Sequence, residues 1–159
     1  MELYGNQISA VLERLDISYS QLAKKLGVTQ PNVSVKMKRN TWSCEDLQKM
    51  CDVLNIRYDI KFYYKDGTRF DESVIKKEPD YSDTNISRRI SFIMETLFVT
   101  QTELAERLDM SQSSLSRRFA NNSWKIKDIG KACRALGIGY TVEYTYKNGD
   151  AIFDYSENI

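Results

Sequence analysis

Two stretches of the chain repeat one pattern of polar and apolar residues. Residues 28–42 read VTQPNVSVKMKRNTW, and residues 110–124, which lie 82 positions later, read MSQSSLSRRFANNSW. Thr29 and Ser111 are residue types that cap helix N-termini, so both stretches predict a helix with the same start. Their apolar and capping positions correspond, and the differences fall mainly on the polar residues between them.

The repeat extends beyond these two stretches. Residues 8–67 align with residues 90–149 without a gap, and about a third of the aligned positions are identical. This self-similarity predicts an internal duplication, and two copies favour two like domains over a solenoid. The identical pairs include Leu15/Leu97, Leu22/Leu104, Ala23/Ala105, Leu26/Leu108, Gln30/Gln112, Ser34/Ser116, Trp42/Trp124, Cys51/Cys133, Leu54/Leu136, Tyr58/Tyr140 and Gly67/Gly149.

Each copy predicts four short helices. Ile8, Val11, Leu12 and Leu15 have the spacing of one buried helix face, and so do Ile90, Ile93, Met94 and Leu97. Ser18 and Thr100 are expected to cap the second helix, and Ser43 with Asp46 the fourth. Inward positions of the fourth helix are Leu47, Met50, Cys51 and Leu54 in one copy and Ile129, Ala132, Cys133 and Leu136 in the other.

After the fourth helix, the apolar period changes from 3.6 to 2. Residues 58–64 (YDIKFYY) and 140–146 (YTVEYTY) alternate and are followed by Asp-Gly and Asn-Gly, which are signals for tight hairpins. We expect the two hairpins to pair edge to edge and to bury their aromatic faces on the helices. An alternative is that the Tyr-rich strands form an edge that binds protein.

The second and third helices of each copy predict a helix-turn-helix arrangement. Leu22, Ala23 and Leu26 are expected to point inward, followed after the turn by Val28, Val33 and Met37. The outward positions of the third helix are Gln30, Pro31, Asn32, Ser34, Val35, Lys36 and Lys38. DNA readout needs this geometry, because base edges in the major groove are reached from the start of an inserted helix.

The predicted fold class is α+β, mainly α. It consists of two tandem four-helix helix-turn-helix units, each followed by a β-hairpin and related by a pseudo-two-fold. We expect a first unit at residues 1–70, a polar linker at 71–85 that contains Pro79, and a second unit at 86–159.

Residues 19–34 (YSQLAKKLGVTQPNVS) and 101–118 (QTELAERLDMSQSSLSRR) resemble the Cro/C1-type (XRE) helix-turn-helix family, in which the second of these helices reads operator DNA. The resemblance covers residues 7–56 and 87–138. The chain departs from the family in two ways: it has hairpins where the family usually has a fifth helix, and Asp109 replaces the usual glycine of the turn.

The resemblance implies two sets of DNA-contacting residues. Base contacts are expected from Gln30, Asn32, Ser34, Gln112, Ser114 and Ser116, and a Gln amide can bind adenine bidentately. Phosphate contacts are expected from Ser20, Gln21, Thr29, Lys36, Lys38, Arg39, Gln101, Thr102, Ser111, Arg117 and Arg118, with guanine as a second target for the basic residues.

Each of these residues also has a purely structural interpretation. Thr29 and Ser111 serve as N-caps in either case, whereas Gln30, Gln112 and the basic residues could form an ordinary solvated face. Trp42 and Trp124 are expected to pack over the end of the third helix rather than to stack on a ligand. Cys51 and Cys133 are expected in the core.

Composition argues against several classes of protein. A hydrophobic content of 42%, a charged content of 28% and the lack of a long apolar run or an export signal predict a soluble cytoplasmic chain, not a membrane protein. Three Cys and no His argue against disulfides and zinc, and neither a phosphate loop nor a nucleophile with a base is visible. We therefore expect no metal, no cofactor and no enzymatic activity.

The charge distribution leaves nucleic acid as a partner. The net charge is only +1, but residues 18–49 hold six basic and two acidic residues. We predict a DNA-binding transcriptional regulator, a repressor or autoregulator of bacterial or phage origin, that binds an imperfect palindrome of double-stranded DNA as a covalent pseudo-dimer. Further homodimerisation through hairpin edges is expected to be open to it. The alternative is a protein-binding module, such as a phage inhibitor of a host defence protein, alone or combined with repression.

Overall fold

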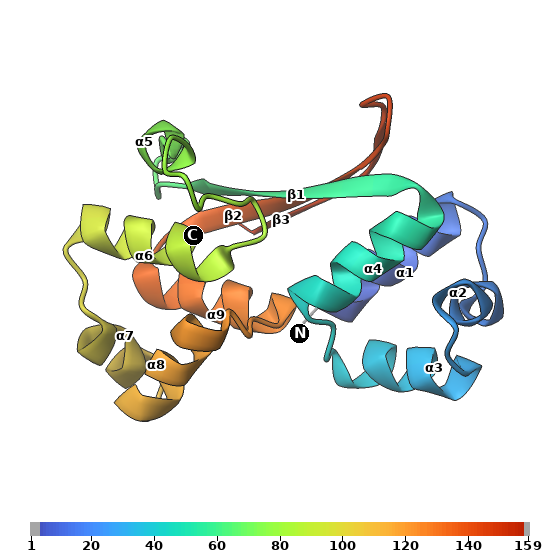
Figure 1. The fold of residues 1–159 in the computed structure, drawn as a ribbon, viewed down its shortest axis with the longest axis horizontal. Coiled ribbons are helices and arrows are strands. Elements are labelled where there is room, and N and C mark those ends of the chain that lie inside the picture. Colours follow the sequence, from blue (N-terminus) through green and yellow to red (C-terminus); the bar gives the residue numbers. More distant parts are fainter. Residues whose placement is uncertain (1–3, 158–159) are drawn as a thin grey trace. The chain divides into compact units, whose positions relative to one another are not determined.

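The computed structural model describes residues 4–157, whose ribbon is shown in Figure 1. The first part contains α1 (Tyr4–Arg14), α2 (Tyr19–Leu26), α3 (Gln30–Arg39), α4 (Cys44–Leu54) and β1 (Ile56–Tyr63). There follow α5 (Ser73–Lys76), α6 (Ile86–Leu97), α7 (Gln101–Arg107), α8 (Gln112–Asn121), α9 (Ile126–Leu136), β2 (Gly139–Tyr146) and β3 (Ala151–Glu157). The strands form one antiparallel sheet in the order β1-β2-β3. The α+β class, mainly α, is confirmed, while the pseudo-two-fold relation of tandem units stays a prediction.

The helix starts lie where the capping residues predicted them. Ser18, Ser43 and Thr100 form capping boxes, in which each hydroxyl accepts the N–H three residues later and the side chain there accepts the N–H of the cap. Thr29 and Ser111 cap α3 and α8 in the same way through their hydroxyls. These caps satisfy N–H groups that a helix leaves unbonded, which stabilises each start by about 1 kcal/mol.

The first predicted hairpin forms only in part. After β1 the chain makes the Asp-Gly turn and returns antiparallel through a bridge between Tyr63 and Arg69. Two backbone hydrogen bonds flank the bridge, from Tyr64 to Thr68 at 2.7 Å and from Phe70 to Phe62 at 3.0 Å, but no second strand extends from it. Phe70 is then buried, and the Asp71 carboxylate accepts the N–H of Ser73 at 3.0 Å as the chain turns into α5. The second hairpin is confirmed, because β2 and β3 flank the Asn-Gly turn.

The chain divides into two compact units that are discontinuous in sequence. The first unit joins residues up to 60 with 125–127 and 141–156, and the second joins 61–124 with 128–140 and the chain from 157 onward. The predicted division into residues 1–70, 71–85 and 86–159 describes the repeated sequence and stays a prediction. The compact units follow other bounds, because they exchange strand residues.

In the first unit, strand residues from late in the chain complete the core of α1 to α4. The Tyr144 hydroxyl of β2 donates to Oε1 of Gln7 on α1 at 2.6 Å, and both side chains are buried. The Arg14 guanidinium lies 4.8 Å from the ring centre of Phe153 on β3. Val142 is also buried, so a strand that follows α9 in sequence packs in the unit that contains α1.

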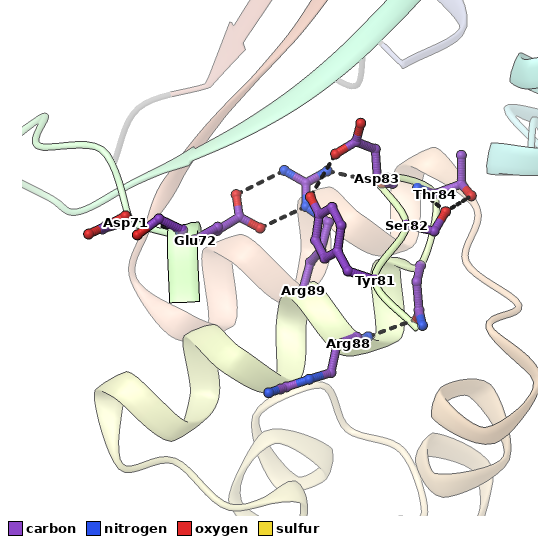
Figure 2. A network of polar contacts seen from close by, with 10 residues as sticks. Asp71, Glu72, Tyr81, Ser82, Asp83, Thr84, Arg88 and Arg89 are labelled. Atoms are coloured by element: carbon purple, nitrogen blue, oxygen red, sulfur yellow. Dashed lines mark hydrogen bonds and ion pairs between the residues drawn. The ribbon is translucent and has the colours of Figure 1, made fainter. Parts of the chain in front are cut away.

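In the second unit, a buried ion pair joins the segment before α6 to α6 itself. Glu72 and Arg89 are 4% and 3% exposed, and two hydrogen bonds of 2.8 and 3.0 Å link their charged groups (Figure 2). Arg89 also donates to the carbonyl of Asp83 at 3.2 Å and lies over the Phe62 ring of β1. Residues 71–85 are therefore not an extended linker over their whole length, since Glu72 and Ile75 are core residues of this unit.

The inward positions of the core are mostly confirmed. Ile8, Val11, Leu12, Leu47, Met50 and Cys51 are buried, as are Ile90, Ile93, Met94, Ile129, Ala132 and Cys133. Five further predicted inward residues, Leu15, Leu26, Met37, Leu54 and Leu97, are only partly buried. Val28 is exposed over 42% of its surface. Val28 lies in the turn between α2 and α3 and therefore does not belong to the buried face of either helix.

The buried ion pair predicts that the Glu72 and Glu78 carboxylates contribute very differently to the free energy of unfolding. Glu72→Gln leaves Arg89 buried beside an uncharged partner, which should lower the free energy of unfolding by about 3–5 kcal/mol. Glu78→Gln removes one of two carboxylate partners of Arg88, which also pairs with Glu95, and the Glu78 bonds lie near the surface, so stability should change little. Urea unfolding of both variants measures this, and equal losses would contradict the role given to Glu72.

Candidate DNA-binding interface

The position of α3 is set by its packing on α2. Leu22 and Ala23 of α2 and Val33 of α3 are buried, and the small Ala23 side chain lets the two helices approach closely. The turn between them requires a left-handed residue, which is Gly27 at φ 72°. Behind it the N–H of Val28 donates to the carbonyl of Ala23 at 3.0 Å. In Figure 1 these two helices lie beside one another in blue.

The pair α7 and α8 is built in the same way. Leu104, Ala105 and Leu115 are buried, and the N–H of Met110 donates to the carbonyl of Ala105 at 3.0 Å. Asp109 occupies the turn position at φ 53°, so the prediction that Asp tolerates the left-handed conformation there is confirmed. The turn thus keeps its left-handed residue and its closing hydrogen bond although aspartate replaces the glycine.

The predicted base-contacting residues lie on the first two turns of α3 and α8. Gln30, Asn32, Gln112 and Ser116 are exposed, and Ser34 and Ser114 are partly buried. Two of them already have partners within the chain: Ser114 accepts a hydrogen bond from Ser111 at 2.8 Å, and Ser116 donates to Gln101 at 3.1 Å. Their contacts with bases stay predictions.

The predicted phosphate-contacting residues divide into two groups. The exposed ones are Ser20, Gln21, Thr29, Lys38, Arg39, Thr102, Ser111 and Arg117. Lys36, Gln101 and Arg118 are only partly exposed. In the exposed group, Gln21, Thr29 and Ser111 also cap helices, so their structural role and a contact with phosphate would coexist.

Lys36 and Arg118 each lie close to an aspartate and a tryptophan, which was not predicted from the sequence. The Lys36 ammonium bonds the Asp46 carboxylate at 2.7 Å and lies 5.9 Å from the ring centre of Trp42. The Arg118 guanidinium lies 3.8 Å from Asp128 and 5.6 Å from the ring centre of Trp124. The sequence held one signal for these contacts: Asp46 and Asp128 are 82 residues apart, as are Lys36 and Arg118. Both cations therefore help to fix the helix that carries them, whereas Lys38 and Arg39 remain on the exposed face.

The two tryptophans are core residues, as expected. Trp42 and Trp124 are 2% and 1% exposed, and the Trp124 indole N–H donates to the Ser87 hydroxyl at 3.0 Å. The Trp42 indole N–H has no hydrogen-bond partner among residues 4–157. In the first copy, the position equivalent to Ser87 is a glycine, so it offers no hydroxyl to the Trp42 indole.

The two helix-turn-helix segments differ strongly in charge. Residues 19–39 contain Lys24, Lys25, Lys36, Lys38 and Arg39 and no acidic residue, which gives a formal charge of +5. Residues 101–121 contain Arg107, Arg117 and Arg118 against Glu103, Glu106 and Asp109, which gives +3 − 3 = 0. Phosphate attraction therefore favours the first segment.

Comparison with known proteins identifies the first segment. Residues 7–59 match the family model of the Cro/C1-type HTH DNA-binding domain, which covers α1 to α4 and the start of β1. These residues therefore form a domain of a DNA-binding class. No curated protein and no solved structure shows significant similarity to the chain. Within residues 4–157, no helix combines the length and the apolar character that crossing a membrane requires.

The Lys36–Asp46 contact predicts a pH-dependent contribution to stability. Burial opposes ionisation of Asp46, but hydrogen bonds from Lys36 and from the N–H of Ser43 outweigh it and lower the pKa of this carboxyl. A lowered pKa in the folded state stabilises the protein above about pH 4, and this stabilisation is lost as the pH falls through the folded pKa. Asp46→Asn should therefore be less stable than the parent at pH 7, with the difference shrinking by pH 3. Urea unfolding at both values measures this, Asp59→Asn gives the background of an exposed carboxylate, and an unchanged difference would contradict it.

The charge difference predicts which cations control the salt dependence of DNA binding. Replacing both Lys38 and Arg39 by Ala should reduce the slope of log K against log salt concentration by about 0.9 for each phosphate that these cations bind in the parent. The control replaces Lys76 and Lys77, two exposed cations at the end of α5, and changes net charge equally. If both double variants shift the slope alike, overall charge rather than phosphate binding by α3 explains the effect.

Proposed function

We propose that this protein is a sequence-specific DNA-binding transcriptional regulator, a binding protein rather than an enzyme. It acts as a repressor or autoregulator of bacterial or phage origin and works in the cytoplasm, where its DNA is. The single observation that carries the proposal is α3, a helix capped by Thr29 that exposes Gln30 and Asn32 at its start within the domain matched at residues 7–59.

The geometry of α3 suits insertion into a major groove. A recognition helix contacts base edges with its N-terminal residues, and Gln30 and Asn32 carry amides that can bind adenine bidentately. Thr29 precedes them at the helix N-terminus, where backbone N–H groups and the helix dipole favour a phosphate. Lys38 and Arg39 at the other end of α3 would contact the DNA backbone.

The second recognition helix is α8, and it makes the site unsymmetrical. In a covalent pseudo-dimer, α3 and α8 would enter successive major grooves about 34 Å apart. At the positions of Gln30, Asn32 and Ser34, α8 carries Gln112, Ser114 and Ser116. One of the three positions thus differs, as do further outward residues, so the half-sites form an imperfect palindrome. A further homodimer would use the outer strands β1 and β3.

A second candidate function is protein binding through the second helix-turn-helix segment. Its formal charge is zero, and Phe98, in the turn before α7, is 91% exposed in a left-handed conformation at φ 57°. An exposed aromatic in this conformation is uncommon and suits a protein contact. A phage inhibitor of a host defence protein would use such a surface, alone or together with DNA binding by α3.

Selection from random double-stranded DNA tests the proposed function. The parent should enrich two unlike half-sites one helical turn apart, and its binding should weaken steeply with salt. Enrichment of identical half-sites would contradict the imperfect palindrome. Absence of DNA binding at low salt, together with capture of a host protein, would support the second candidate.

Paired variants assign each helix to its half-site. Gln30→Ala with Asn32→Ala should relax one half-site, and Gln112→Ala with Ser114→Ala the other. If both pairs weaken binding equally, the two helices contribute equally to DNA binding. If only the first pair weakens binding, only α3 contacts DNA.

A further inference from the structure

The faces of α3 and α8 opposite the core carry different residues at their centres. Successive residues of a helix are 100° apart, so Val35 lies about 160° around α3 from the buried Val33. Arg117 has the same relation to the buried Leu115 on α8. Val35 and Arg117 are also 82 residues apart, so matching positions of the two helices carry an apolar side chain and a cation.

Val35 is an apolar side chain on α3 that the chain leaves partly uncovered. It is 44% exposed, and with Val28 it borders a pocket of about 420 Å³ that residues of α2, α3 and α4 line. A valine has no hydrogen-bonding group, and its branched side chain is stiff. Among base edges in the major groove, the only apolar feature is the C5-methyl group of thymine.

Arg117 differs from the other two arginines of its segment. Arg107 pairs with Glu103, and Arg118 lies against Asp128. Arg117 is exposed and makes no ion pair with any residue from 4 to 157. A guanidinium directed away from the core of a recognition helix matches the O6 and N7 acceptors of guanine.

We propose that Val35 and Arg117 are specificity-determining residues that distinguish the two half-sites. Val35 contacts the methyl group of a thymine, and Arg117 binds a guanine at the corresponding place in the other half-site. This inference rests on the proposed DNA-binding function and adds to it the bases that make the palindrome imperfect.

The test of Val35 uses the selected DNA site with thymine replaced by deoxyuracil, which removes only the methyl group. Each thymine of the half-site that depends on Gln30 and Asn32 is replaced in turn, and Kd is measured for the parent, for Val35→Ala and for the control Val74→Ala. Val74 is an exposed valine on α5. At one position the parent and the control should bind thymine about fourfold more tightly than deoxyuracil, as expected for one buried methyl group. Val35→Ala should bind both alike.

The test of Arg117 replaces each guanine of the other half-site by adenine. The parent and the control Arg69→Ala, which removes an exposed cation, should favour guanine by about 5- to 150-fold at one position. Arg117→Lys keeps the charge but lacks the bidentate fork, and Arg117→Ala lacks both. Both variants should lose most of this preference.

Different results would contradict the proposed DNA-binding function and the roles given to Val35 and Arg117. If the parent binds no specific DNA, the proposed function is wrong. If the parent binds unlike half-sites but Val35→Ala keeps the preference for thymine over deoxyuracil, or Arg117→Ala keeps the preference for guanine, the inference is overturned while the function stands. Half-sites that lack thymine or guanine at those places would also overturn it. Each preference is a ratio within one variant, so it does not depend on how much of the variant is folded.

Discussion

Burial of the strand side chains beneath the helices is the constraint on which the rest of this structure depends. A two-stranded hairpin is marginal in water, so its apolar face needs a cover. In the first unit Tyr144 and Val142 of β2 are buried, and Tyr144 bonds Gln7 of α1. Burial raises the pKa of Tyr144, so its hydroxyl keeps its proton and remains a donor to the Gln7 carbonyl. A helix near one end of the chain is therefore held by a strand near the other, and neither compact unit is a continuous stretch of sequence.

The first unit also holds α3, the helix that we propose contacts DNA. Trp42 is buried, the Lys36 ammonium of α3 lies 5.9 Å from its ring centre, and its carbonyl accepts the N–H of Ile126 at 2.9 Å. Asp46 holds Lys36 from α4, and Ser43 begins α4 with a capping box. Recognition requires side chains held at fixed positions, because base contacts are directional. Lys36 therefore helps to hold α3 against α4, whereas the exposed Lys38 and Arg39 are the α3 cations proposed to contact phosphate.

Features that depend on neighbouring residues could be predicted from the sequence. The caps at Ser18, Thr29, Ser43, Thr100 and Ser111, and the left-handed Asp109, each follow from a single residue type and its local hydrogen bonds. Contacts between distant residues could not be predicted in the same way. Glu72 is one of several acidic residues in a polar stretch, and nothing local shows that it is buried against Arg89. The short return after β1 has the same origin, since Phe70 and Glu72 are buried directly after the correctly predicted turn. For the site, the exposed helix starts could be predicted, whereas the partners of Lys36, Ser116 and Arg118 required the fold.

Two recognition helices in one chain, each in its own major groove, would leave a distinctive trace on DNA. Hydroxyl-radical footprinting of the parent protein on its selected site measures this directly, because bound protein shields the sugars beside each occupied groove. The account predicts two protected stretches whose centres lie about 10 base pairs apart on one face of the duplex. A single protected stretch, or none, would contradict it.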